Sequence, residues 1–223
     1  MTTFDLQDGV RALNAHLHGD VDGALIAINP AGRHAVAVGA TAAHEVTIEG
    51  NVGYYCGGMN QLANLDIRGN AGPGLAENMM SGRVTVRGDA SQYCGATAHG
   101  GLVVVEGNAS SRCGISMKGV NIVVRGNVGH MSAFMAQKGC LLVCGDAGDA
   151  LGDSLYEARL YVRGSVASLG ADCTEKPMAA EHLEEVQQLL TDAAISDIQP
   201  SEFRRYGSAR KLYHFDIDNA SDY

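Results

Sequence analysis

The segment VVVEGNASSRCGISMKGVNIVVRGN, residues 103–127, contains the pattern that decides the fold. The run VVVEGN that begins at Val103 returns as IVVRGN at Ile122, which defines a 19-residue period. A fixed period of this length in a glycine-rich chain is typical of a repeat architecture, in which each unit forms one structural coil.

The same period extends in both directions from this segment and defines seven glycine anchors. Two and four residues before each anchor the chain carries an apolar, mostly β-branched residue, which indicates a strand with one buried face. An Asn, Asp or Ser follows each anchor. We expect these pairs to form turns, because Gly tolerates positive φ and Asn or Asp bonds its own backbone. The anchors are Gly50, Gly69, Gly88, Gly107, Gly126, Gly145 and Gly164.

This repeat predicts an all-β protein, a β-solenoid or β-helix of seven 19-residue coils over residues 46–170. Inward side chains of successive coils would stack about 4.8 Å apart, so that no coil buries its apolar face alone. Residues 1–45 are expected to form an N-terminal helix and capping strands. Residues 171–223 are expected to form a C-terminal helix and a partner-docking tail.

The first 45 residues carry a helical pattern followed by two short apolar runs. The helical pattern predicts an amphipathic helix that caps the solenoid, since an open strand edge invites aggregation. The apolar runs predict capping strands at Ala24–Ile28 and Ala35–Val38. The apolar positions of the expected helix are Leu6, Val10, Leu13 and Leu17.

The outward strand position, three residues before each anchor, changes character along the repeat. It is polar on the first three coils and apolar on the last four, and apolar side chains on an outer face need a cover. Ala179–Thr191 carries leucines and a valine on one helical face. We therefore expect this helix to fold back on the solenoid or to cap its last coil. The outward positions are Thr47, Asp66, Thr85, Val104, Val123, Leu142 and Tyr161.

The composition excludes several classes of function. The chain has 223 residues and a net charge of −9, with 46% hydrophobic and 18% charged residues. These values are typical of a globular protein, and the acidic balance argues against nucleic acid or an anionic membrane as the main partner. No apolar run is long enough to span a bilayer, and the first residues lack the pattern of a signal peptide. The expected location is cytoplasmic, where the six cysteines would be reduced.

Chemically reactive side chains are scattered over the repeat. Cys56, Cys94 and Cys113 each lie six residues after an anchor, which predicts small buried thiols, with the last two stacked on adjacent coils. The histidines of the repeat region fall at three different offsets and form no ladder. We therefore predict no catalytic residue, no cofactor-binding residue and no metal ligand on this chain. The histidines are His44, His99 and His130.

A group of methionines nine to eleven residues after the anchors is a stronger signal. Met fills irregular cores, but it is also frequent on adaptable binding surfaces, and here Asn, Ser, Lys and Gln are interleaved with it. We interpret this corner, together with the C-terminal tail, as a protein–protein interface. The corner contains Met59, and the candidate interface residues are Asn78, Met79, Met80, Ser81, Met117, Lys118, Met135, Gln137, Tyr206, Arg210 and Tyr213.

Several segments resemble a known family. The 19-residue coils resemble the β-helical domain that ends the large chain of glutamate synthase, over about residues 46–170. Nearly the whole chain is similar to the freestanding glutamate-synthase-like subunit of N-methylglutamate synthase (methylamine–glutamate N-methyltransferase). The segments that carry this resemblance are GYYC (53–56), AENMMSG (76–82), NASSRCGISMKG (108–119), GHMSAFM (129–135) and the tail RYGSARKLY (205–213).

The resemblance implies a right-handed solenoid that acts as a structural, non-catalytic subunit of a hetero-oligomer. One partner would be an amidotransferase-like subunit. The other would be an FMN-binding glutamate-synthase-like subunit that also carries an iron–sulfur cluster. The complex would form N-methyl-L-glutamate and ammonia from methylamine and L-glutamate. Neither nucleic acid nor membrane would be a partner.

Three alternatives remain open. The coils also resemble the β-helical subunit of formylmethanofuran dehydrogenase and of its formyltransferase/hydrolase relative, although the tail favours the first family. An independent enzyme on a β-solenoid would need carboxylates or a histidine gathered on one column. A stand-alone binding module would use the methionine corner alone.

Overall fold

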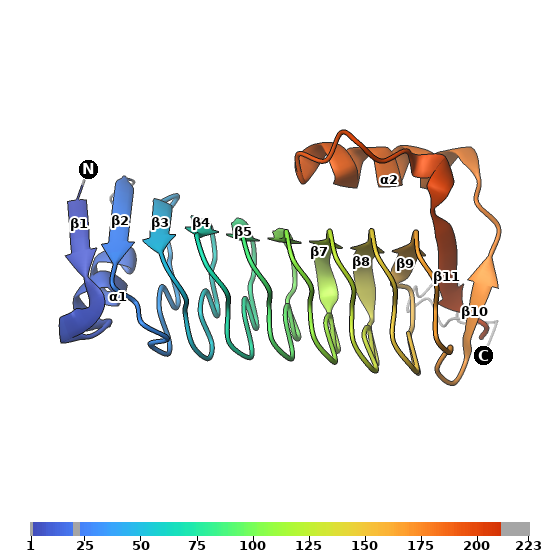
Figure 1. Cartoon of the computed structure of the whole chain (residues 1–223), viewed down its shortest axis with the longest axis horizontal. Helices are drawn as coiled ribbons and strands as arrows, with labels where there is room; N and C mark the ends of the chain where they lie inside the picture. The colour runs from blue at the N-terminus through green and yellow to red at the C-terminus, as the bar shows by residue number, and fades with distance from the viewer. Residues whose placement is uncertain (1, 20–22, 211–223) are drawn as a thin grey trace, which may run out of the picture.

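The computed structural model of the protein describes residues 2–19 and 23–210. In this part of the chain, eleven strands form one sheet in the order β1-β2-β3-β4-β5-β6-β7-β8-β9-β11-β10. Figure 1 shows the strands as successive rungs of an elongated stack, with α1 at one end and α2 lying across one side near the other. The predicted all-β solenoid is confirmed.

The elements of the solenoid are short because each coil turns several corners. Its strands are β1 (Thr2–Asp5), β2 (Ala24–Ile28), β3 (Glu45–Glu49), β4 (Asn64–Ile67), β5 (Arg83–Val86), β6 (Leu102–Val105), β7 (Lys118–Val124), β8 (Lys138–Val143) and β9 (Arg159–Val162). The other elements are η1 (Leu6–Asp8), α1 (Arg11–Leu17), β10 (Cys173–Lys176), α2 (Ala180–Asp192), η2 (Pro200–Glu202) and β11 (Arg204–Ser208).

The seven predicted strands are β3 to β9, paired in parallel with Cα partners one 19-residue period apart. Val46 lies opposite Leu65, and Leu65 lies opposite Val84. Inward residues of all coils join one core cluster, to which Leu6 also belongs. A second column of single bridges runs from Val52 to Val166 two residues after the anchors, so each coil is also held on another side.

The stack also extends toward the N-terminus beyond the seven predicted coils. The expected strand Ala24–Ile28 is β2, which pairs in parallel with β3 as a further rung. The expected strand Ala35–Val38 is wrong. Ala35 and Ala37 have φ of 54° and 55°, which is incompatible with an extended strand. This segment forms a corner instead, and the Ala35 N–H donates to the carbonyl of Tyr54 at 2.8 Å.

The N-terminal apolar pattern forms two short elements rather than one helix. Gly9, with φ of 113°, separates η1 from α1. The leucines at the predicted positions nevertheless point into the core, where Leu6 is 1% exposed and Leu13 and Leu17 are fully buried. The predicted helical cap at this end is therefore present.

The anchor glycines are required for a reason other than the expected one. Only Gly50 has positive φ, at 125°, so the turns do not need the left-handed region at the other six anchors. A Cβ at Gly107 would lie 2.3 Å from Asp89 Oδ1 and 2.7 Å from the Gly88 carbonyl oxygen, and comparable overlaps occur at the remaining five. The anchors are glycine because the backbone of the preceding coil passes directly against them.

The Asn and Asp residues after the anchors also act differently from the expectation. Each side-chain Oδ1 accepts a hydrogen bond from the backbone N–H of the equivalent residue in the next coil, at 2.7–2.9 Å. These bonds join coils instead of closing local turns. The ladder runs without interruption through Asn51, Asn70, Asp89, Asn108, Asn127, Asp146 and Ser165.

The helix α2 folds back over the apolar outer face, which is one of the two predicted positions. Val186, Leu189 and Leu190 join a second core cluster with the four outward apolar residues of the last coils. Beyond the last coil, β11 pairs antiparallel with β9, and β10 pairs antiparallel with β11. Both apolar faces of the sheet are thus covered where α2 lies.

Polar contacts hold the α2 segment in place. Glu185 accepts a hydrogen bond from the hydroxyl of the buried Tyr161 and pairs with Arg159 at 2.5 Å. Burial and the bond to Glu185 both raise the pKa of Tyr161, so the phenol stays a donor. Arg83 donates to the Asp192 carbonyl at 2.7 Å, near the end of the helix.

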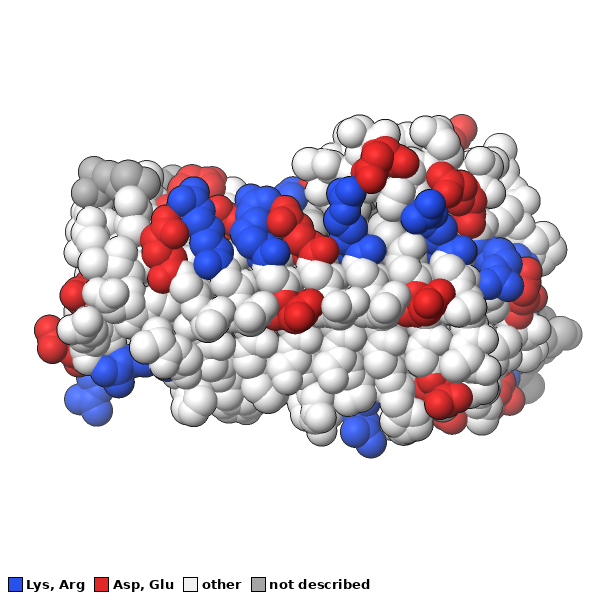
Figure 2. Space-filling model, in the orientation of Figure 1, with Lys and Arg blue, Asp and Glu red and all other residues white. Residues whose placement is uncertain are grey.

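Ion pairs between coils lie along one surface, where Figure 2 shows blue and red side chains alternating. Arg68 pairs with Glu49 at 2.8 Å, and Arg87 pairs with Glu106 at 2.5 Å, in each case across one 19-residue period. Arg125 forms an ion pair with Asp197, which follows α2 in the chain. These pairs are solvated and contribute little stability each.

No helix in residues 2–19 and 23–210 is long and apolar enough to cross a membrane.

The close anchor contact predicts that Gly107→Ala lowers the free energy of unfolding by about 1–3 kcal/mol, since the methyl group overpacks against the preceding coil. Gly207→Ala is the matched control, because a Cβ there would meet only the flexible Lys176 side chain, at an ordinary 3.5 Å. Denaturant titrations of both variants measure the difference. Equal stability of the two would contradict the proposed role of the anchors.

The Asp146 carboxylate predicts a pH dependence. Its bonds from the Ser165 N–H and hydroxyl hold the pKa of Asp146 below its usual value. A depressed pKa stabilises the fold above the unfolded value and loses that contribution as pH falls through the folded value. Asp146→Asn, which keeps the acceptor oxygen, should therefore flatten the fall in thermal midpoint below about pH 4. Glu184→Gln, on the exposed side of α2, removes a carboxylate outside the ladder and is the control.

Candidate protein-interaction surface

One corner of the solenoid is built from overlapping turns that repeat in each coil. In the coil that begins at Gly88, Tyr93, Gly95 and Thr97 have φ of 63°, 66° and 54°. The Ala96 N–H bonds to the Tyr93 carbonyl at 3.1 Å, which matches a type II turn with positive φ at its third residue. Because left-handed residues alternate with ordinary ones, side chains along the corner still point alternately outward and inward.

This alternation divides the predicted methionine group into two sets. Positions ten residues after the anchors point inward, where Met79 and Met117 are fully buried in the core. Positions nine and eleven point outward, where Met59, Met80 and Met135 are 46%, 49% and 49% exposed. The prediction that Met79 and Met117 belong to an interface is therefore wrong, because its window of nine to eleven residues included an inward position.

Two further exposed apolar side chains lie close to these methionines in the repeat. Tyr156 is 49% exposed and, like Met80, lies eleven residues after an anchor. The repeat could therefore have identified Tyr156 as an outward position. Leu62 is 51% exposed and has no equivalent in the other coils. Its loop is held by the buried Asn60, whose amide donates to the Ala63 carbonyl at 2.8 Å and accepts from the Ala63 N–H at 3.1 Å. We call Met59, Leu62, Met80, Met135 and Tyr156 the exposed corner.

The exposed corner forms two groups with a polar stretch between them. Met59, Leu62 and Met80 occupy the first two coils, and Met135 and Tyr156 occupy the fifth and sixth. Three rungs of about 4.8 Å separate Met80 from Met135. The exposed His99 and Lys118 occupy the intervening rungs of one column. Apolar groups separated by polar side chains are typical of a protein-contact surface.

The remaining candidate residues of this corner have different environments. Lys118 and Gln137 are exposed. Asn78 is half-buried, and its carbonyl oxygen accepts a hydrogen bond from the Thr97 hydroxyl at 2.6 Å, so it supports the stack. Ser81 is half-buried, and its backbone carbonyl accepts from the Asn60 amide at 3.2 Å.

The tail candidates are also divided. Tyr206 is 2% exposed because β11 packs it against β9, so it is not a surface residue and that prediction is wrong. Arg210 is exposed and forms an ion pair with Asp172. Tyr213 lies outside the described residues.

The three predicted thiols, Cys56, Cys94 and Cys113, are fully buried. Burial raises the pKa of Cys56 to about 12. A hydrogen bond with Cys94, together with burial, raises the pKa of Cys113 well above its usual value, which confirms the predicted stacking of these two. Since the thiolate is the nucleophile and the metal ligand, these thiols are poor candidates for either role.

No group of three or more His, Cys, Asp or Glu side chains gathers to hold a metal ion in residues 2–19 and 23–210. His44 is fully buried, and neither ring nitrogen has a hydrogen-bond partner among the described residues. The ring of His16 lies 5.9 Å from it, centroid to centroid. The His99 side chain, by contrast, is exposed on the corner.

The corner predicts opposite outcomes for two adjacent methionines. Met79→Ala should lower the free energy of unfolding by about 2–5 kcal/mol, because it leaves a cavity in the core. Met80→Ala should change it by less than about 0.5 kcal/mol, because that side chain is half exposed. Denaturant titration of the two variants measures both values. Similar losses would show that the inward and outward positions are assigned incorrectly.

Comparison with known proteins gives one full-length relative. Protein GlxC of Rhizobium meliloti (strain 1021) is 59% identical over 223 residues, which is 100% of this chain and 98% of that protein. No family model matches the chain.

Proposed function

The chain belongs to the family of Protein GlxC, and on that premise we propose that it is a structural, non-catalytic subunit of a glutamate-synthase-like enzyme. More specifically, the enzyme would be an N-methylglutamate synthase, which forms N-methyl-L-glutamate and ammonia from methylamine and L-glutamate. This assignment rests on the segments that resemble the glutamate-synthase-like subunit of that enzyme.

The observation that carries a binding role is the exposed corner. Its five apolar side chains are each about half exposed on coils whose other outward positions are mostly polar or covered. Exposed apolar side chains that gather on one face and are bordered by polar residues mark interaction sites more often than scattered ones do. Because the left-handed turns fix the backbone beneath them, the two groups are held at a constant separation.

The division of labour assigns the chemistry to the partners. FMN and an iron–sulfur cluster would be bound by the FMN-binding glutamate-synthase-like subunit, and ammonia chemistry would involve the amidotransferase-like subunit. Cys56, Cys94 and Cys113 do not suit a cluster, because these thiols are buried within the stacked core. The role proposed for this chain is to hold both partners in register, in the cytoplasm.

Co-expression with an amidotransferase-like and an FMN-binding glutamate-synthase-like subunit tests this proposal. The three chains should co-purify with N-methylglutamate synthase activity. Replacing Met80 and Met135 together with Asp should weaken the association at least about tenfold, which corresponds to 1.4 kcal/mol. Gln187→Asp, on the exposed face of α2, is the matched control and should assemble normally.

Three results would each contradict a part of the proposal. Binding of FMN by the purified single chain, or its conversion of methylamine and glutamate, would exclude a non-catalytic role. Selective association with formylmethanofuran-type partners would favour the alternative, the β-helical subunit of such a complex. Normal assembly of the Met80→Asp/Met135→Asp variant would show that another surface contacts the partners.

A further inference from the structure

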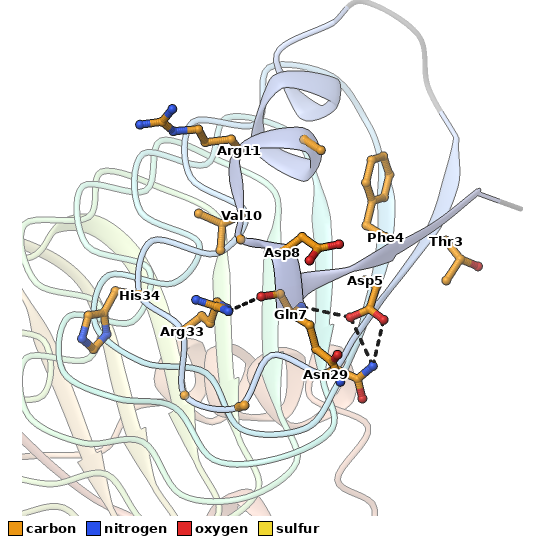
Figure 3. A pocket seen from close by; sticks show the side chains of 14 residues that line it. Thr3, Phe4, Asp5, Gln7, Asp8, Val10, Arg11, Asn29, Arg33 and His34 are labelled. Atoms are coloured by element: carbon orange, nitrogen blue, oxygen red, sulfur yellow. Dashed lines mark hydrogen bonds between the residues drawn. The ribbon is translucent and has the colours of Figure 1, made fainter.

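The cations of this chain are used in two different ways. Six arginines form ion pairs with acids of the same chain. At the hollow of about 1290 Å³ beside β1, Arg33 donates to the Gln7 carbonyl, while the Arg11 side chain projects away from it (Figure 3). The sequence contains only four lysines, and two of them, Lys118 and Lys138, lie next to each other beside the exposed corner.

The two lysines are brought together by an irregularity of the sheet. Lys118 begins β7 and Lys138 begins β8, and they are Cα partners in this parallel pair. The 19-residue period alone would place Gln137 opposite Lys118, but a register shift moves Lys138 into that position. Both side chains are exposed, and neither forms an ion pair with an acid in the described part of the chain. This holds even for Glu157, which lies one period after Lys138.

This lysine pair does not serve the fold. Like charges that lie side by side on neighbouring strands destabilise a sheet, and the fold uses arginine for its own ion pairs. A carboxylate that accepts hydrogen bonds from both ammonium groups at once would remove the repulsion, and such charge-assisted bonds are stronger than neutral ones. The pair therefore indicates a binding site for an anionic group on the surface of a chain whose net charge is −9.

The apolar side chains of the exposed corner lie symmetrically about this pair. Met80, Lys118 and Tyr156 each lie eleven residues after an anchor, so they belong to one column. Lys118 is two rungs from Met80 and two rungs from Tyr156, which is about 10 Å in each direction. A partner that fits this column must present an anion between two apolar side chains, each about 10 Å away from it.

We propose that Lys118 and Lys138 bind an Asp or Glu side chain on a helix of a partner subunit, and that apolar residues of this helix cover Met80 and Tyr156. This inference rests on the proposed function, in which the exposed corner is a docking surface. Helical residues seven positions apart lie two turns apart on one face, about 10.5 Å along the axis. An extended strand covers this distance in three residues, which places the side chains on opposite faces.

The helix α2 shows that the solenoid accepts such a segment along its axis. It runs along the stack in Figure 1 and packs Val186 and Leu189 against outward residues of the last coils. Its acid Glu185, next to Val186 in the sequence, pairs with Arg159 of β9 at 2.5 Å. The partner helix would use the same combination of apolar contact and ion pair, with lysines in place of the arginine.

Carbodiimide coupling in the co-expressed complex tests the contact, because it joins an amine directly to a carboxylate that touches it. Lys118 or Lys138 should be coupled to an Asp or Glu of a partner subunit, which mass spectrometry of the digested product identifies. Apolar residues should lie seven positions before and after that acid. Lys118→Arg/Lys138→Arg should assemble normally but lose the crosslink, since guanidinium keeps the charge and does not couple.

The salt dependence of assembly tests the charge. Lys118→Gln/Lys138→Gln should weaken association about three- to tenfold at low salt, the range expected for two exposed ion pairs. Its dissociation constant should also rise less with added salt than that of the wild type, since salt screens only charged contacts. An unchanged circular dichroism spectrum shows that the variant is folded. Gln187→Glu/Gln188→Glu, on the exposed face of α2, changes the net charge equally and should bind like the wild type.

Three outcomes would overturn the inference, and they are distinguishable. Wild-type affinity and salt dependence of Lys118→Gln/Lys138→Gln would overturn it while leaving the proposed function intact. Coupling of the lysines only to acids of this same sequence would show that the occupant is this chain or a second copy of it. Failure of the three wild-type chains to co-purify would remove the proposed function and this inference with it.

Discussion

The structure depends on the contact between successive glycine anchors. Along five consecutive anchor pairs, from Gly69 to Gly164, each N–H donates to the carbonyl of the preceding anchor at 2.9–3.0 Å. The Asn and Asp side chains beside them bond the next coil in the same direction. Both ladders can form only if equivalent residues of successive coils lie opposite each other. They therefore fix the register in which the apolar columns stack. The core, the corner and the outer face all inherit their alignment from this line of contacts.

The regular part of this fold could be predicted because it is encoded as a period. The strands, the inward columns and the apolar outer face each recur with the 19-residue period. The outward strand position changes from polar to apolar at Val104, and this change predicted the cover that α2 supplies. The additional N-terminal rung could not be found in this way. Its register places Asn29, with φ of 55°, at the anchor position, and the chain from there to Gly50 is longer than one period. Without the glycine and with this extra length, that coil has no repeat signal.

The candidate surface was only partly predictable for a related reason. The sequence shows that methionines gather at one corner, but it does not show which of them point outward. That parity is set by left-handed residues such as Met59, Thr97 and Ser116, which are not glycine and give no local turn signal. Left-handed φ costs roughly 1–2 kcal/mol per non-glycine residue. Here the stacked hydrogen bonds from neighbouring coils offset that cost, so the conformation is a property of the array rather than of the local sequence.

The stack also restricts the distances between surface features along its axis to multiples of the rung spacing. Any surface feature that repeats with the coils can be moved along the axis only in steps of about 4.8 Å, because a partial coil would break both ladders at once. Loss or gain of one 19-residue unit between the two apolar groups would change their separation by one rung spacing. It would leave their orientation unchanged. A scaffold of this kind can adjust the distance between two bound proteins without turning either of them.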